Sequence, residues 1–261
     1  MCQECGCGLG GGDVKIGGHS HDHGHEHHHH DEPGHHHDHC HAHEPVTLNL
    51  NRSLMEKNDR LAERNRGFFR AKKLLVLNVV SSPGSGKTTF IRETAAKLAG
   101  KLRVGVIVGD LATDNDAAQL RTAGIPVVQI TTGTVCHLDA DMVSKAAAQL
   151  DLDKLDVLVI ENVGNLVCPA DYDLGEDLRV VLLSTTEGED KPLKYPPMFH
   201  SAQVAVVTKG DLAAAAGFDR AQTLTNLKRV SHHAQVFEVS AKTGDGMQAW
   251  LDFLLKRHAC H

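Results

Sequence analysis

The sequence predicts an α/β domain with a mostly parallel sheet over residues 71–261. Short runs rich in Val, Ile and Leu alternate there with segments that favour helix, and the runs are continuously apolar rather than alternating with polar residues. Continuous runs suit strands that are covered on both faces, and the helices between them supply parallel crossovers. Ligands of such a sheet bind at the carboxyl ends of the strands.

Seven strands are expected, at residues 74–80, 103–108, 126–130, 156–161, 179–184, 203–207 and 235–239. Helices are expected at residues 88–99, 115–123, 138–150, 219–230 and 245–257. Ahead of this domain, residues 46–70 repeat apolar pairs seven residues apart, which predicts an amphipathic helix. Packing of that helix on its own domain is the expectation, and binding to a partner is the alternative.

The first 45 residues differ in composition from the rest. Residues 1–8 (MCQECGCG) form a Cys-rich motif, and residues 9–45 contain Gly, acids and most of the histidines. A segment with so few aliphatic side chains cannot bury enough apolar surface to offset the entropy of ordering, so residues 9–45 are expected to be disordered without metal. Residues 1–45 carry eight acids and one lysine against a net charge of −6 for the whole chain. The remainder is therefore near neutral and gives no reason to expect nucleic acid or membrane partners.

The seven cysteines, an odd number, do not show the pattern of a disulfide-bonded secreted domain. The chain does not open with a basic patch followed by an apolar run, as a signal peptide would. No run approaches the roughly 18 apolar residues of a membrane-spanning helix. We expect a soluble, cytoplasmic protein with reduced thiols.

The first predicted strand leads into a glycine-rich loop, SSPGSGKTT at residues 81–89, and a helix-forming stretch follows. The glycines let the backbone approach phosphate oxygens, and the N–H groups of the loop and helix start supply positive charge. The Lys87 ammonium would reach the β- and γ-phosphates, and the Thr88 hydroxyl would bind Mg²⁺. The usual pattern has Gly where this chain has Ser81. The loop predicts a P-loop NTPase whose nucleotide contacts are Gly84, Ser85, Gly86, Lys87, Thr88 and Thr89.

Two motifs near the end of the domain select guanine. Thr208-Lys209-Gly210-Asp211 follows a strand, as the Asn-Lys-x-Asp motif of G proteins does. The Asp211 carboxylate can accept from both N1–H and the 2-amino group of guanine, which adenine does not offer in that arrangement. After the last strand, the loop Ser240, Ala241 and Lys242 resembles the one that donates a backbone N–H to guanine O6. GTP is therefore preferred to ATP, although Thr208 departs from the usual Asn.

An acidic segment, Glu161-Asn162-Val163-Gly164, ends the strand at residues 156–161. Its arrangement resembles a switch in which the acid contacts water-bound Mg²⁺ and the Gly164 amide contacts the γ-phosphate. Asp110, at the end of the second strand, is another candidate for Mg²⁺ or for positioning water. No motif in the sequence identifies a glutamine that would position the attacking water or an arginine that would act as an arginine finger. Intrinsic hydrolysis is therefore expected to be slow.

Three thiols, Cys2, Cys5 and Cys7, lie within six residues at the start of the chain. With the nearby terminal amine they favour square-planar Ni(II) or tetrahedral zinc, and the residues alone leave that choice open. Free thiols at a frayed terminus are the simpler alternative. Residues 19–43 hold 14 of the 20 histidines, mixed with acids and glycines. Many weak imidazole sites suit metal storage or transfer, and an expression tag is the competing explanation.

A second candidate metal site lies within the α/β domain. Cys136 and His137 follow the third strand, and Cys168 comes four residues after Gly164. Both segments therefore emerge at the nucleotide end of the sheet, beside the γ-phosphate switch. By position alone, Cys and His near strand ends are more often packing residues.

The blocks MCQECGCG, SSPGSGKTT, TGTVCHLDA, ENVGNLVCP and EGEDKPLKYPPMF, together with the His-rich insert, resemble the HypB family, the GTPases of nickel insertion in [NiFe]-hydrogenase maturation. The resemblance implies a GTP-dependent nickel chaperone with a tight nickel site at Cys2, Cys5 and Cys7. It implies a nickel or zinc site at Cys136, His137 and Cys168, near a dimer interface that nucleotide or metal promotes. Hydrogenase accessory proteins and the hydrogenase large subunit are the implied partners. The related urease nickel GTPases are less similar in the last three blocks.

Two other functions were weighed against the chaperone. A nickel storage or buffering protein would depend on residues 1–45, with the GTPase activity secondary. A small-molecule kinase on the same fold is disfavoured by the guanine motifs at residues 208–211 and 240–242. The expected ligands are thus GTP or GDP, Mg²⁺ and Ni²⁺, with Zn²⁺ as an alternative at the inner site.

Overall fold

The computed structural model describes residues 46–261, so the Cys-rich motif (1–8) and the His-rich segment (9–45) lie outside the described residues. One seven-stranded sheet has the order β3-β2-β4-β1-β5-β6-β7, and every neighbouring pair is parallel. The strands are β1 (Leu75–Ser81), β2 (Val104–Asp110), β3 (Val127–Thr131), β4 (Val157–Glu161), β5 (Leu178–Ser184), β6 (Val204–Thr208) and β7 (Gln235–Glu238). Each lies within two residues of its predicted bounds, which confirms the parallel α/β fold.

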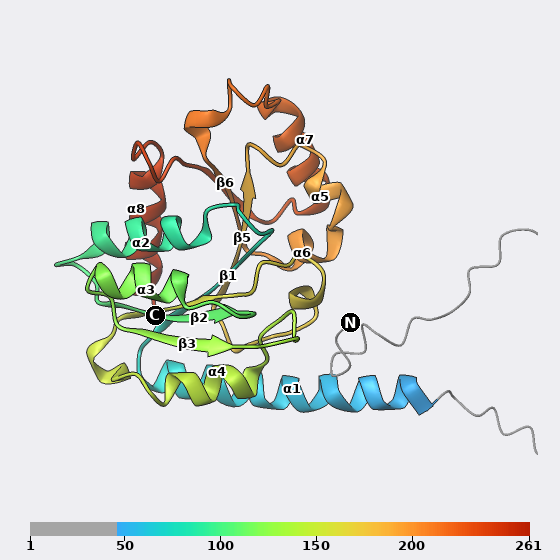
Figure 1. Ribbon diagram of the computed structural model, residues 1–261, viewed down its shortest axis with the longest axis vertical. Coiled ribbons are helices and arrows are strands. Elements are labelled where there is room, and N and C mark those ends of the chain that lie inside the picture. The colour runs from blue at the N-terminus through green and yellow to red at the C-terminus, as the bar shows by residue number, and fades with distance from the viewer. Residues whose placement is uncertain (1–45) are drawn as a thin grey trace, which may run out of the picture.

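Helices cover both faces of the sheet (Figure 1). On one face pack α2 (Lys87–Leu98), α3 (Asn115–Thr122) and α8 (Met247–Ala259). The other face carries α1 (Val46–Ala71) and α4 (Ala140–Ala147) at one side, and α6 (Pro196–Ser201) and α7 (Arg220–Val230) at the other. Alternate β1 residues point to opposite faces: Leu75 and Leu77 lie in the apolar core of the first face, and Val76 and Val80 lie in two separate apolar clusters of the other face.

Two helical regions differ from the prediction. The helix α4 begins at Ala140 rather than at residue 138 because Asp139 caps it, its carboxylate accepting from Met142 N at 2.7 Å, and it ends at Ala147, three residues before the predicted end. The short helices α5 (Lys191–Lys194) and α6 were not predicted, since Pro192, Pro196 and Pro197 suggest a loop. These prolines occupy first-turn positions, where a missing N–H costs no helical hydrogen bond.

The helix α1 packs on its own domain through the second residue of two predicted apolar pairs, Leu61-Ala62 and Phe68-Phe69, and through two asparagines that the pairs did not predict. Leu54 and Phe68 are each 47% exposed, whereas Asn58, Ala62, Asn65 and Phe69 are buried along one side. Asn58 accepts from Ala140 N and donates to Asp173 O, both at 2.9 Å. Asn65 donates to Ala140 O at 2.7 Å and to Leu174 O at 3.2 Å. The helix thus ties the start of α4 to the 173–174 loop. Among residues 46–261, no helix has the length and apolar character needed to cross a membrane.

Replacing Asn65 tests this attachment. Asn65→Ala leaves the carbonyls of Ala140 and Leu174 without their amide donor in a buried site, so the free energy of unfolding should fall by about 1–3 kcal/mol. Urea denaturation measures it. The exposed neighbour Arg64→Ala is the control and should change little. Equal stability of the Asn65 variant and the wild type would contradict the attachment.

Candidate functional site

The glycine-rich loop joins the end of β1 to the start of α2, in the strand–loop–helix order that phosphate binding requires. Gly84 (φ 74°) and Gly86 (φ 93°) adopt left-handed conformations that residues with a Cβ rarely take. Gly86 caps α2, so the first N–H groups of that helix face the loop. The backbone therefore forms a site for an anion at the carboxyl end of β1.

The structure explains why the phosphate loop can begin with Ser81 where the usual pattern has glycine. Ser81 is a buried strand residue outside the left-handed region, so no glycine is needed there. Its hydroxyl accepts from Lys87 Nζ at 3.0 Å and donates to Ser82 O at 2.7 Å. Burial lowers the pKa of Lys87, and nearby carboxylates, Glu161 first, oppose that shift. Ser81 thus gives the Lys87 ammonium a polar partner inside the loop.

A carboxylate and a hydroxyl meet beside this loop, where the sequence predicts Mg²⁺. Thr88 Oγ1 donates to Glu161 Oε1 at 2.7 Å, and Glu161 is only 2% exposed. Its other oxygen, Oε2, has no hydrogen-bond partner among the described residues. Burial raises the pKa of Glu161 to about 7, against the opposing effects of Lys87 and Thr88. A buried carboxyl with one unsatisfied oxygen beside a hydroxyl fits the oxygen-donor chemistry of Mg²⁺.

The second acidic candidate, Asp110, lies at the end of β2 and is partly buried. Its carboxylate accepts from the backbone N–H of Ala112 at 2.9 Å and of Thr113 at 3.1 Å. Burial alone would raise the pKa of Asp110, but these hydrogen bonds outweigh burial and the pKa is lowered. Asp110 also acts electrostatically on Lys87 and Glu161, which places it near the phosphate loop.

The residues predicted to bind guanine line one cavity of about 240 Å³. Its walls include Ser85, Gly86 and Thr89 from the phosphate loop and α2, Lys209 and Asp211 after β6, and Ala241 and Lys242 after β7. Ser240 does not line it, but Ser240 Oγ donates to Asp211 Oδ1 at 2.7 Å. Ser240 is thus placed to orient the carboxylate that would read the base.

Thr208 tethers the loop that is predicted to bind the base. Its hydroxyl donates to Ser85 O at 2.8 Å, and Lys209 Nζ donates to Gly84 O at 2.7 Å. Lys209 is also one of two residues other than glycine at positive φ (58°) within residues 46–261. Replacement of the usual Asn by Thr208 therefore leaves the base loop attached to the phosphate loop.

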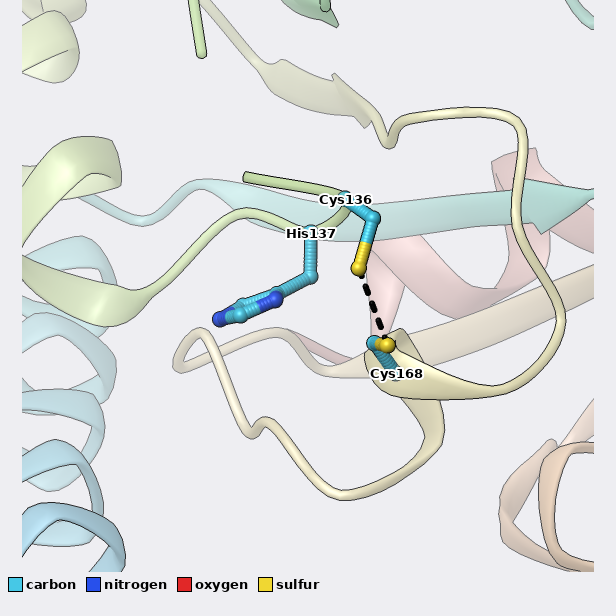
Figure 2. Close-up of side chains that lie close together, drawn as sticks. All are labelled: Cys136, His137 and Cys168. Atoms are coloured by element: carbon cyan, nitrogen blue, oxygen red, sulfur yellow. Dashed lines mark hydrogen bonds between the residues drawn. The ribbon is translucent and has the colours of Figure 1, made fainter. Parts of the chain in front are cut away.

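The three inner metal candidates come together at one point. Ligand atoms of Cys136, His137 and Cys168 all lie within 4.8 Å of one another, and Cys136 Sγ donates to Cys168 Sγ at 2.9 Å. Figure 2 shows the two sulfur atoms facing each other with the His137 ring alongside. Two thiols and one imidazole form a donor set that suits nickel or zinc.

His137 is held in a state that suits metal binding. The side chain is 4% exposed, and its Nδ1 has no hydrogen-bond partner among residues 46–261. Burial lowers the pKa of His137, against a weaker effect of Asp139, so the neutral imidazole is favoured. The Tyr172 ring stacks on it with ring centroids 3.9 Å apart. Tyr172 was not anticipated from sequence, since no motif marks it.

One short segment joins the two halves of the site. It starts at Glu161, beside Thr88, and reaches Cys168, beside Cys136. Between them Gly164 lies against the phosphate loop, where a Cβ would come 3.2 Å from Pro83 Cα. The predicted proximity of the switch and the thiols is therefore present in the folded domain.

Sequence reasoning also missed Lys191, at the start of α5. Its Nζ donates to Ser82 Oγ at 3.0 Å and lies 3.7 Å from Glu187 Oε1, so a second ammonium group sits on the phosphate loop. The block EGEDKPLKYPPMF contains this residue but gives it no role by itself. The candidates Cys2, Cys5 and Cys7 lie outside the described residues.

Comparison with known proteins agrees with this site. Residues 75–238 match the family model "CobW/HypB/UreG, nucleotide-binding domain". Hydrogenase maturation factor HypB of Escherichia coli K12 is 50% identical over 207 residues, which cover 79% of this chain and 71% of that protein. The probable HypB of Methanocaldococcus jannaschii is 39% identical over 209 residues, covering 80% of this chain and 95% of that protein.

Solved structures give the same relationship. HypB from Helicobacter pylori, crystallised in complex with nickel, aligns with a TM-score of 0.75 and 40% identity, over 78% of this chain and 95% of that one. HypB from Archaeoglobus fulgidus aligns with a TM-score of 0.73 and 38% identity, over 78% of this chain and 99% of that one. With its P-loop nucleotide-binding domain, the chain belongs to the HypB family of hydrogenase maturation factors.

Proposed function

We propose that this chain is a GTP-hydrolysing nickel metallochaperone that delivers Ni(II) during [NiFe]-hydrogenase maturation. Its nucleotide state would control metal binding and dimerisation, and hydrogenase accessory proteins and the hydrogenase large subunit would be its partners. The observation that carries the proposal is the segment from Glu161 to Cys168, which touches the phosphate loop at one end and the thiol pair at the other. The named activity of the relatives and the nickel in the Helicobacter pylori structure support the choice of cargo.

Nucleotide binding follows from the two loops at the carboxyl end of the sheet. The ammonium of Lys87 would leave Ser81 for the β- and γ-phosphate oxygens, and Asp211, oriented by Ser240, would accept from guanine. Thr88 and Glu161 would hold Mg²⁺, Thr88 as a direct ligand and Glu161 through water. The ion would supply positive charge to the phosphate oxygens during hydrolysis.

Nickel is the cargo at the inner site. Cys136, His137 and Cys168 provide three donors, and water or a second copy of the chain would supply a fourth. GTP at the phosphate loop would order residues 161–164, and the movement would reach Cys168 within a few residues. Because metal–ligand bonds tolerate displacements of only about 0.2 Å, a small shift of one thiol is enough to change affinity.

Asp211→Asn tests guanine recognition. The amide cannot accept from N1–H and the 2-amino group together, so GTP affinity should fall about 10- to 100-fold. Xanthosine triphosphate, whose 2-carbonyl accepts from an amide, should bind more tightly than to the wild type. Fluorescent nucleotide titration measures both affinities. The exposed Asp252→Asn should match the wild type, and an unchanged GTP affinity in the Asp211 variant would reject this assignment.

Cys168→Ala tests the inner metal site. Loss of one of three donors should weaken nickel binding there by at least about 10-fold. The readout is the free nickel concentration that protects Cys136 from alkylation, measured by mass spectrometry of the Cys136 peptide in the full chain. Cys260→Ala removes an exposed thiol elsewhere and should leave that concentration unchanged. Equal protection in both variants would exclude Cys168 as a ligand.

Lys87→Ala separates the chaperone from a storage protein. The variant keeps residues 1–45, whose histidines would serve storage, but removes the ammonium that binds phosphate. Cells that depend on this chain should lose hydrogenase maturation while retaining nickel on the protein. Lys97→Ala, exposed on the same helix, is the control. Maturation at the wild-type level in the Lys87 variant would favour storage instead.

A further inference from the structure

A group of four buried polar side chains lies between apolar parts of one sheet face. Its members are Asn78, Asn162, Glu176 and Arg179. We call them the polar link. In the sheet register, Asn78 on β1 is opposite Arg179 on β5 and Ile160 on β4, so it sits at the centre of the sheet. Its neighbours on this face, Val76 and Val80, belong to two different apolar clusters. Polar groups in such a place must satisfy one another, because water does not reach them.

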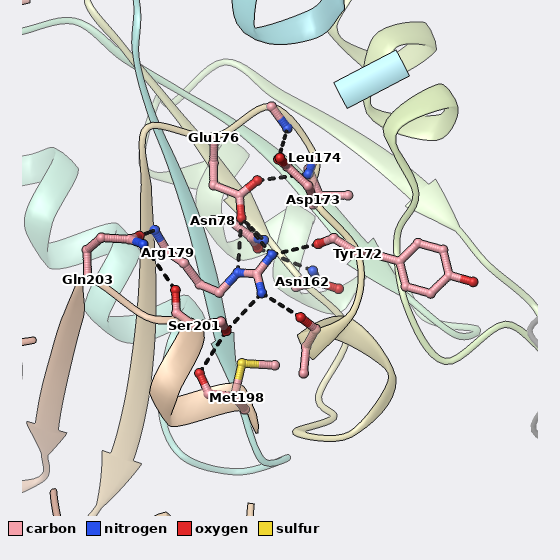
Figure 3. A network of polar contacts seen from close by, with 12 residues as sticks. Asn78, Asn162, Tyr172, Asp173, Leu174, Glu176, Arg179, Met198, Ser201 and Gln203 are labelled. Carbon is pink, nitrogen blue, oxygen red and sulfur yellow. Dashed lines mark hydrogen bonds and ion pairs between the residues drawn. The ribbon is translucent and has the colours of Figure 1, made fainter. Parts of the chain in front are cut away.

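Arg179 holds the loop that carries Cys168. Its guanidinium donates to Ala170 O at 2.9 Å and to Tyr172 O at 2.7 Å, the carbonyls two and four residues after that cysteine. Figure 3 shows these bonds spreading from Arg179 to the loop, to Ser201 and to Glu176. Since Tyr172 also stacks on His137, Arg179 positions two parts of the metal site at once.

Asn162 touches both the switch and the metal loop. It directly follows Glu161, and its Oδ1 accepts from Val163 N at 2.9 Å and from Leu138 N at 3.4 Å. Leu138 is the residue after His137. The Asn162 side chain therefore joins the backbone of the segment that contacts the phosphate loop to the backbone beside a metal ligand.

The two ends are connected through Asn78 and Glu176. Asn162 Nδ2 donates to Asn78 Oδ1 at 3.2 Å, and Asn78 Nδ2 donates to Glu176 Oε1 at 3.1 Å. The same Glu176 oxygen accepts from Arg179 Nε at 3.0 Å. A displacement of Asn162 alone would leave buried polar groups without partners, so these residues are expected to move together.

We propose that the polar link transmits the nucleotide state to the geometry of Cys136, His137 and Cys168, with Asn162 and Arg179 as positioning residues. This inference rests on the proposed coupling of nucleotide to nickel and adds the side chains that carry it. GTP-driven ordering of residues 161–164 would shift Asn162, and the shift would reach Leu138 directly and the Cys168 loop through Asn78, Glu176 and Arg179. A shared set of hydrogen bonds, rather than chain connectivity alone, sets the coupling.

The test measures coupling in the full chain. A chelator buffer sets the free nickel concentration. Peptide mass spectrometry then gives the concentration at which nickel protects half of Cys136 and Cys168 from alkylation. The titration is done once with GDP and once with a non-hydrolysable GTP analogue. The ratio of the two half-protecting nickel concentrations measures the coupling. In the wild type the two concentrations should differ by a factor of about 5 to 150, in either direction. Asn162→Ala should bring the ratio close to one.

Arg179→Lys is the second variant. The lysine keeps a positive charge beside Glu176 but cannot donate to the carbonyls of both Ala170 and Tyr172. The ratio of this variant should also approach one. Gln203→Ala is the matched control, since it removes a 2.8 Å hydrogen bond to the backbone N–H of Arg179, leaves the guanidinium contacts in place and should keep the wild-type ratio. Thermal unfolding verifies that each variant is folded. A variant that weakens nickel binding equally in both nucleotide states, with an unchanged ratio, has a structural defect only and overturns the polar link. A wild-type ratio of one overturns the proposed coupling itself.

Discussion

The hydrogen bond from Thr88 to Glu161 is the contact on which the site depends, because it joins the phosphate loop to the strand that leads to the metal loop. It exists because β4 lies directly beside β1 in the parallel sheet, so both carboxyl ends open at one edge. The strand order also places the loop after β3, which carries Cys136 and His137, near the segment after β4. The phosphate loop and the cluster of Cys136, His137 and Cys168 are therefore joined by residues 161–168.

Several polar side chains at and beside residues 161–168 are buried. Glu161, Asn162, Asn78 and Arg179 all lie in the interior, where an unpaired polar atom costs about 1–3 kcal/mol. Each of them is paired except for Glu161 Oε2, which lacks a partner among the described residues. A donor or a cation at that oxygen would offset this cost.

Much of the fold could be predicted from sequence because buried parallel strands need continuous apolar runs, and the phosphate loop needs glycines at Gly84 and Gly86. The prediction also brought Cys136, His137 and Cys168 to one end of the sheet, where the structure places their ligand atoms within 4.8 Å of one another. Asn78, Arg179 and Tyr172 could not be identified, since their roles depend on which strands are neighbours. Helices α5 and α6 were missed because proline is compatible with both loops and first turns.

The proposed coupling would be reciprocal: if nucleotide changes the affinity for nickel, nickel changes the affinity for guanine nucleotide by the same factor. The most direct measurement is calorimetric titration of the full chain with a non-hydrolysable GTP analogue, with nickel at the inner site and without it. If residues 161–168 couple the two sites, the analogue should bind with different affinities in the presence and absence of nickel. The ratio of these two affinities should equal the ratio of the nickel affinities measured in the two nucleotide states. Identical affinities with and without nickel would show that the two sites are neighbours but independent.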